Sequence, residues 1–279
     1  MQDRIGGMAR LDFERLDRLA DERRGDFSGA EPFPHVVIDD FLPRETAEEV
    51  HAEFADTAEG WNHYHHYNEK KLALTDVGRM GPATQALFGA LQSRPFVDFV
   101  ESLSGIDGLL ADPDLDGAGM HKIMPGGFLN VHTDFLSHTK NRHWSRQINL
   151  LIYFNKDWQE DWQGNLELWD ENMENCVESV APVFNRCVIF HTRRRSFHGH
   201  PHRLACPDGE ARKSIALYYF RDEGAVRELT PTNYQPLPED PALKKLLIAA
   251  DRNLLRAYSF AKRYTGLSDR TIDRILKKF

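Results

Sequence analysis

The sequence predicts a mainly β fold with flanking helices: a double-sheet jelly roll braced by N-terminal helices and followed by a C-terminal helical extension. Between residues 117 and 221, short apolar runs alternate with turn residues, a spacing typical of a β-sandwich or barrel. Before residue 106 and after residue 236, apolar residues recur at helical spacing instead. We therefore expect one domain over 1–235, with its core at about 117–221, and a basic helical extension over 236–279.

The N-terminal elements follow from periodicity and from the residues that interrupt it. Apolar residues recur every two to three positions in the charged segment 10–24, which predicts a helix. Gly25, Gly29 and Pro32 are expected to end this helix, because glycine and proline disfavour helix interiors. The apolar run within 33–42 predicts a short buried strand.

Three more helices are expected before the β core. The segment 44–54 follows Pro43 and has acidic residues near its start, and both proline and carboxylates favour a helix N-terminus. The segments 82–92 and 94–104 also show helical spacing. We expect these helices to cover the outer face of one sheet.

The β core is expected to consist of short strands separated by turns. They lie at 117–124, 128–134, 145–154, 164–169, 176–180, 186–191, 196–200 and 212–220. The most apolar of them are 145–154 and 212–220. Because a strand buried on both faces is apolar almost throughout, these two are expected to lie in the middle of a sheet.

Charge is distributed unevenly along the chain. Ten lysines and arginines against three aspartates give residues 241–279 a net charge of +7, so the rest of this −8 chain carries −15. Nucleic-acid binding by the acidic body is not expected, since phosphate binding needs dense positive charge. The basic extension can meet an acidic partner or an anionic membrane surface, or pack its apolar stripe on the body.

The sequence shows no stretch of 18 or more apolar residues, so no membrane span is expected. The first ten residues lack the apolar core of a signal peptide, and we expect a cytoplasmic protein. Cys176, Cys187 and Cys206 form an odd set without metal-type spacing and are expected to be free thiols.

A candidate metal site begins with His132 and Asp134. They stand two residues apart in an expected strand, so their side chains point to one face, roughly 6.5 Å apart along the chain. A second histidine would complete the 2-His-1-carboxylate triad of non-heme Fe(II) oxygenases, which leaves three coordination positions open. His198 and His200, about 65 residues further on, both offer that imidazole.

A candidate anion-binding residue heads the strand at 212–220. The guanidinium of Arg212 is planar and permanently charged, and its fork can bind both oxygens of a carboxylate. Strand alternation puts Ser214 on the same face.

Together these residues resemble a known family. Residues 117–221 look like the catalytic core of Fe(II)/2-oxoglutarate-dependent dioxygenases, in the prolyl-4-hydroxylase-like branch. The motifs that carry the resemblance, in the family's order, are His132-Thr133-Asp134, Tyr153-Phe154-Asn155-Lys156-Asp157-Trp158, Gly164-Asn165-Leu166, Arg194-Arg195-Ser196-Phe197-His198 and Arg212. The resemblance implies a double-stranded β-helix fold with iron bound by His132, Asp134 and His198, and the Arg-Arg-x-x-His run favours His198 over His200.

The resemblance also implies a cosubstrate site and a reaction. Arg212 would bind the distal carboxylate of 2-oxoglutarate, Tyr153 would donate a hydrogen bond to it, and Ser214 and Leu166 would contribute to the same pocket. Such an enzyme uses Fe(II) and O₂, with ascorbate as reductant, to convert 2-oxoglutarate to succinate and CO₂ and to hydroxylate an unactivated C–H bond.

Three hypotheses for the function are consistent with this sequence. The substrate can be a prolyl or other residue of a protein, or it can be a small molecule or sugar-containing metabolite. The alternative from another class is a cupin-like metal-binding or scaffold protein without turnover, which has no need of Arg212 or Tyr153 in its pocket.

Other polar groups are weaker candidates. The histidine- and tyrosine-rich segment 61–67 is either a second metal site or an exposed edge. The polar loop 138–144 either reads an anionic substrate or is solvated. His121 and Lys122 are candidates for the lining of the cosubstrate pocket.

Overall fold

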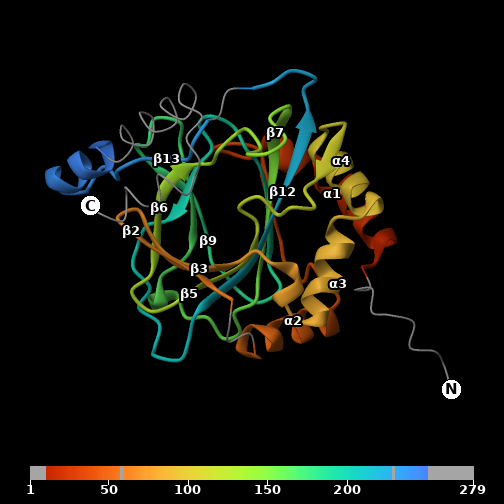
Figure 1. Cartoon of the computed structure of the whole chain (residues 1–279), viewed down its shortest axis with the longest axis horizontal. Coiled ribbons are helices and arrows are strands. Elements are labelled where there is room, and N and C mark those ends of the chain that lie inside the picture. Colours follow the sequence, from red (N-terminus) through yellow and green to blue (C-terminus); the bar gives the residue numbers. More distant parts are fainter. Residues whose placement is uncertain (1–10, 57–59, 228–229, 251–279) are drawn as a thin grey trace.

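The computed structural model describes residues 11–56, 60–227 and 230–250, and it shows a curled β-sheet with the helices that precede the β core packed on one side (Figure 1). The helices before the core are α1 (Phe13–Gly29), α2 (Arg44–Asp56), α3 (Pro82–Leu91) and α4 (Arg94–Ser104), with 3-10 turns at Val77–Arg79 and Glu160–Trp162. A further helical segment covers 242–250. The remainder of the expected basic extension, 251–279, lies outside the described residues.

The strands are connected by hydrogen bonds into one sheet. They are β1 (His35–Ile38), β2 (Asn62–His66), β3 (Glu69–Leu74), β4 (Leu109–Ala111), β5 (Gly119–Ile123), β6 (Phe128–Thr133), β7 (Trp144–Tyr153), β8 (Leu166–Trp169), β9 (Cys176–Val180), β10 (Cys187–His191), β11 (Phe197–His200), β12 (Arg212–Asp222) and β13 (Asn233–Tyr234). The main path runs β1-β10-β7-β12-β5-β3-β6-β11-β8-β9, and it curls into a nearly closed barrel (Figure 1). The predicted fold class is therefore confirmed, and β7 and β12 are interior neighbours as expected.

The helices cover one face of this sheet and form the larger core with it. Phe54 of α2 packs on Phe154 with ring centroids 5.6 Å apart, and Phe96 of α4 stacks on Tyr219 of β12 at 6.3 Å. The Tyr219 hydroxyl donates to the Leu91 carbonyl at 2.9 Å, which ties β12 to α3. The opposite face of β7 and β12 is thereby left to line the barrel interior.

The first helix is longer than the sequence predicted. It passes through Gly25 and ends at Gly29. Phe27 is only 1% exposed, and burying a phenylalanine stabilises by roughly 1.5–3 kcal/mol, more than the cost of about 1 kcal/mol for a helical glycine. Tertiary packing therefore overrides the local signal.

The hairpin of β2 and β3 was not predicted as a pair of strands. β3 pairs with β2 along one edge, and along its other edge it pairs first with β6 and then with β5, for example Glu69 with Leu129 and Leu72 with Lys122. This strand therefore joins the two halves of the barrel, although its own sequence is half charged.

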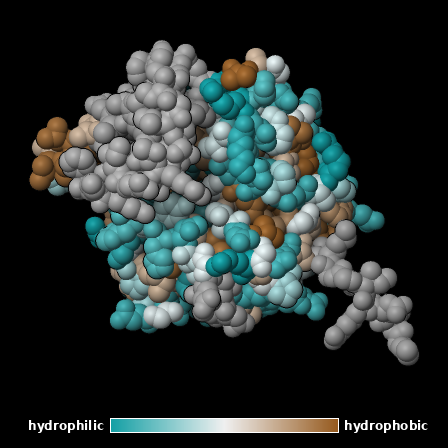
Figure 2. All heavy atoms as spheres, in the orientation of Figure 1, coloured by the Kyte–Doolittle hydropathy of each residue, from teal (hydrophilic) through white to brown (hydrophobic). Residues whose placement is uncertain are grey.

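Most of the visible surface is hydrophilic, with apolar residues scattered over it (Figure 2). Within the described part of the chain, no helix combines the length and apolar character that a bilayer crossing requires. Cys187 and Cys206 are buried and Cys176 is exposed, and all three are free thiols as expected.

Candidate active site

Three side chains converge on one point inside the barrel. His132 of β6 lies directly opposite His198 of β11 in the strand register, and their ring centroids are 4.5 Å apart. Nε2 of His132 lies 3.5 Å from Oδ1 of Asp134, and Nε2 of His198 lies 3.3 Å from Oδ2. One atom of each of the three residues lies within 4.8 Å of the other two, and all three are buried. This is the donor set and spacing of a 2-His-1-carboxylate metal site.

The backbone fixes how each imidazole is presented. Nδ1 of His132 lies 2.9 Å from the Asn130 carbonyl, and Nδ1 of His198 lies 2.9 Å from the Ser196 carbonyl. Because a carbonyl only accepts, each Nδ1 carries a proton, so Nε2 is the nitrogen of each ring that a metal can bind. Burial also lowers the pKa of His132, which favours the neutral form that binds metal.

The close approach of β11 to β6 requires a glycine between the two candidate histidines. A Cβ on Gly199 would lie 2.9 Å from the Leu129 carbonyl oxygen and 2.9 Å from Cα of Val131. The register shifts between His198 and His200, so that His198 faces His132 while His200 does not join the cluster. The geometry thus favours His198, as the sequence did.

Asp134 is held by two side chains of β7. Nη2 of Arg146 donates to its Oδ2 at 3.0 Å and Nδ2 of Asn149 donates at 2.6 Å, while Nε of Arg146 donates to Oδ1 of Asn149 at 2.7 Å. Burial raises the pKa of Asp134, but the Arg146 cation and the imidazoles outweigh burial and hold that pKa well below its ordinary value. The carboxylate is therefore ionised and oriented before any cation arrives.

We call the hydrogen bonds that Arg146 and Asn149 donate to Asp134 the carboxylate clamp. This clamp gives a first testable prediction. Replacing Asn149 with alanine removes the shorter of the two hydrogen bonds to Asp134, and the affinity for Mn(II) measured by calorimetry should fall by about 10–100-fold, the usual cost of losing an outer-shell partner. The matched control is Asn165→Ala, because Asn165 is only partly buried and its side chain donates to Ser179 at 3.1 Å, away from Asp134. Equal Mn(II) affinity in the two variants would contradict the clamp.

A buried arginine, Arg212, begins β12 and lies beside Tyr153, the last residue of β7. Arg212 is 4% exposed; its Nε donates to the Gly164 carbonyl at 2.7 Å and its Nη2 to the Tyr153 hydroxyl at 3.3 Å. Both partners are neutral, and Arg212 forms no ion pair with any described carboxylate. A buried cation without a counter-ion is costly, so the surroundings of Arg212 suit an anion.

The other expected pocket residues lie nearby. Ser214 is 2% exposed, stands opposite Tyr153 in the register and shares a strand face with Arg212. Leu166 is 3% exposed and packs in the same apolar cluster as Tyr153. The structure therefore brings Arg212, Tyr153, Ser214 and Leu166 together, while their roles toward a ligand stay predictions.

Three further titratable residues, His121, His200 and Lys71, belong to this part of the barrel interior. Burial, with the charges of Lys71 and Arg212, lowers the pKa of His121 to about 3. Burial, Arg212 and Lys71 also hold the pKa of His200 well below its ordinary value. Both ring nitrogens of His200 are buried without a hydrogen-bond partner among the described residues. Sequence reasoning named His121 and left a role open for His200, but it missed Lys71, because β3 was not predicted.

The weaker candidates are resolved differently. His63, His65 and His66 lie on the exposed strand β2, and within the described chain they join no group that could hold a metal. His138, the first residue of the polar loop, is fully buried 3.2 Å from Asp112, and its Nδ1 accepts the amides of Lys140 and Asn141. His138 itself is therefore not available to a substrate and shapes the loop from inside, while the two alternatives for the rest of the loop stay open.

Comparison with known proteins agrees with this geometry. Residues 118–220 match the family model described as the 2OG-Fe(II) oxygenase superfamily. Prolyl 3-hydroxylase OGFOD1 of Mus musculus is 26% identical over 218 residues, which make up 76% of this chain and 36% of that protein. The chain therefore spans about a third of the length of that curated relative.

Solved structures share the architecture. A prolyl hydroxylase from Trichoplax adhaerens, in complex with a peptide fragment of the hypoxia inducible factor, superposes with a TM-score of 0.55 at 20% identity, covering 76% of this chain and 92% of that one. A prolyl 4-hydroxylase from Phytophthora capsici gives 0.54 at 20% identity, covering 90% and 80%. At such identities these likenesses establish a common fold.

Proposed function

We propose that this protein, whose residues 118–220 carry the core of the 2OG-Fe(II) oxygenase superfamily, hydroxylates an unactivated C–H bond of a polypeptide substrate. One O₂ and one 2-oxoglutarate are consumed for each hydroxyl group formed. One oxygen atom enters the substrate C–H bond, and the other enters succinate as CO₂ leaves. The observation that carries the proposal is the convergence of His132, Asp134 and His198 in a barrel that also buries Arg212, which has no counter-ion among the described residues.

Ferrous iron fits the first of these features. His132 and His198 offer neutral Nε2 donors, and Asp134 supplies one negative charge. This set holds a divalent cation without filling its coordination sphere. When bound there, iron and 2-oxoglutarate together supply the activation of O₂. The task of the protein is to orient the groups and to exclude water, for which a buried site inside a barrel is suited.

A dicarboxylate fits the second feature. Arg212 and Tyr153 would bind the distal carboxylate of 2-oxoglutarate, beside Ser214 and Leu166. The unpartnered nitrogens of His200 support this fit, because buried polar atoms normally have a partner and the charged groups that influence this imidazole most are cations. An anionic cosubstrate would supply the missing acceptor.

The His200 contact can be tested by binding. In His200→Phe, 2-oxoglutarate should bind the Mn(II)-loaded protein about tenfold more weakly, the loss expected for one hydrogen bond to a charged group, while Mn(II) itself binds as before. Calorimetry with Mn(II) avoids turnover. His202→Phe is the matched control, since His202 is half exposed and pairs with Glu167 at 3.2 Å. Unchanged 2-oxoglutarate affinity in His200→Phe would remove this residue from the site.

A polypeptide substrate is supported by the shape beside the triad. A groove of about 740 Å³ adjoins a smaller cavity of about 150 Å³ that is lined by Thr133, the residue between His132 and Asp134. A wide polar groove suits an extended chain, whereas sites for small molecules are mostly apolar and enclosed. The relative named as a prolyl 3-hydroxylase and the Trichoplax adhaerens complex with a peptide point to the same class, with proline as the first residue to test.

The decisive experiment measures coupled turnover. Purified protein with Fe(II), ascorbate, 2-oxoglutarate and air is offered an array of synthetic peptides with or without a central proline. We expect peptides to stimulate succinate formation and to gain the mass of one oxygen atom. If small metabolites stimulate succinate formation and no peptide does, the substrate is a small molecule and not a polypeptide. If no succinate forms under any condition, the oxygenase assignment is rejected.

A further inference from the structure

The groove of about 740 Å³ beside the triad is lined by positively charged side chains. Of the described residues that line it, four are arginines and none is an acid. They are Arg146, Arg193, Arg194 and Arg227. The chain as a whole has a net charge of −8, so this groove is a local exception to the charge of the protein. A cleft lined by one sign of charge concentrates its field on whatever enters it.

The four arginines differ in how far they are already occupied. Arg146 is bound to Asp134, and Nη1 of Arg227 lies 3.4 Å from the partly buried Glu223. Arg193 is exposed, and its Nε donates to Nδ1 of His191 at 3.1 Å, a neutral partner. Arg194 is also exposed and forms no ion pair with the carboxylates that the structure describes. Arg193 and Arg194 are therefore the two guanidinium groups available to a ligand.

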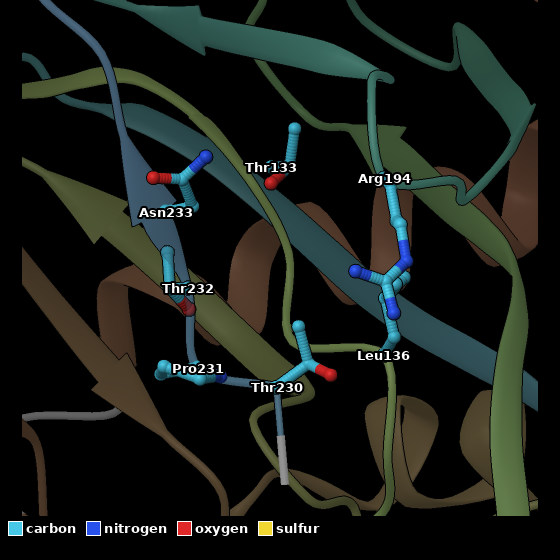
Figure 3. A pocket seen from close by; sticks show the side chains of 7 residues that line it. All are labelled: Thr133, Leu136, Arg194, Thr230, Pro231, Thr232 and Asn233. Atoms are coloured by element: carbon cyan, nitrogen blue, oxygen red, sulfur yellow. The ribbon is translucent and has the colours of Figure 1, made fainter. Parts of the chain in front are cut away.

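The position of Arg194 connects the groove to the chemistry. Its side chain belongs to the groove and to the smaller cavity at the same time, and in the close-up it extends toward the space bordered by Thr133 and Thr230 (Figure 3). Thr133 stands between two residues of the triad. A group bound by Arg194 would thus lie within a residue or two of the reacting C–H bond.

The smaller cavity also offers a peptide-type acceptor. Asn233 pairs with Thr133 in the register of β13 and β6, and its side chain borders this cavity (Figure 3). Its Oδ1 is buried and has no hydrogen-bond partner among the described residues. A backbone N–H of an extended segment would satisfy it, since buried acceptors are normally bonded.

We propose that this groove binds an acidic segment of the polypeptide substrate, with Arg193 and Arg194 holding carboxylates next to the residue that is hydroxylated. The proposal rests on the function proposed above and narrows its substrate class. Guanidinium groups bind carboxylates through paired hydrogen bonds. The two arginines would therefore select a substrate by both the charge and the position of its acidic residues.

The test uses fluorescein-labelled synthetic peptides with a central proline flanked either by glutamates or by glutamines, and protein loaded with Mn(II) and 2-oxoglutarate. By anisotropy, the acidic peptide should bind the wild-type protein more tightly than the neutral one. The Arg193→Gln/Arg194→Gln double variant should lose about tenfold in affinity for the acidic peptide only, as expected for two exposed charge-assisted contacts. Circular dichroism checks that the double variant is folded.

Arg195→Gln is the matched control, because Arg195 is adjacent and exposed but pairs with Glu171 at 3.0 Å outside the groove. Equal binding of the two peptides, or an equal loss in Arg195→Gln, would overturn the inference. So would a labelled single-stranded oligonucleotide that displaces the acidic peptide, since the groove would then select polyanions. The proposed function is tested separately. If the wild-type enzyme forms succinate with proline peptides of any charge, the proposed function holds even where the inference about acidic peptides fails.

Discussion

Replacing Asp134 with alanine should abolish succinate formation, with a loss well beyond the roughly 10–100-fold that an outer-shell change costs. The substitution removes the one carboxylate of the triad and the charge that balances Arg146. The metal content of the purified variant and its Mn(II) affinity should fall together with turnover, which separates loss of the metal from loss of a later step.

Because Asp134→Ala also leaves a buried guanidinium unpaired, it can destabilise the protein. His132→Ala answers this concern, since His132 does not pair with Arg146. The two variants should show the same loss of Mn(II) binding, although only the first leaves a buried charge. Asp98→Ala on α4, which pairs with Arg94 at 2.5 Å on the surface, is the control. Turnover that persists in both triad variants would end the assignment of this site.

Replacing Arg212 with alanine should weaken 2-oxoglutarate binding by about a hundredfold or more and leave Mn(II) affinity unchanged. Hydrogen bonds to charged groups contribute about 1.5–3 kcal/mol each, and two of them correspond to at least that factor. Arg212→Lys should be intermediate, because an ammonium keeps the charge but loses the planar fork. Lys213→Ala, on the next residue and the other strand face, is the control.

A second ligand shows whether Arg212 acts on the distal carboxylate itself. 2-Oxobutyrate has the keto acid but lacks that carboxylate, so the wild-type protein should bind it far more weakly than 2-oxoglutarate. In Arg212→Ala this difference should largely vanish, as in a double-mutant cycle in which one partner is already missing. A difference that survives the substitution would assign the distal carboxylate to another group.

Local sequence signals were sufficient for much of this architecture. The strands expected between residues 117 and 221 correspond to β5 to β12, because alternating apolar residues and turn residues are properties of short segments. The same holds for α2, α3 and α4. The predicted end of α1 was wrong, because the burial of Phe27 outweighs the cost of Gly25 inside the helix. β3 was not predicted, because its pairing with two distant strands stabilises a segment that is half charged.

The candidate site divides in the same way. His132 and Asp134 could be paired from their spacing alone, since strand alternation requires that they share a face. The choice of His198 over His200, and the expectation that Arg212 binds 2-oxoglutarate, came from the resemblance to the family. The clamp formed by Arg146 and Asn149 had no signal in the sequence, because it joins a strand to a carboxylate that lies 12 and 15 positions earlier in the chain.

What the sequence determined by itself was therefore the inventory: which segments become strands and helices, and which side chains are able to bind a metal or a carboxylate. What only the tertiary structure decided was proximity. It brought His198 against His132 where the strands approach so closely that a Cβ on Gly199 would clash. It left Arg212 buried with no counter-ion among the described residues, and it gathered arginines around one groove of an acidic protein. The physical reason is that propensity and periodicity are local, whereas burial, register and electrostatic pairing are set by residues that the chain brings together from far apart.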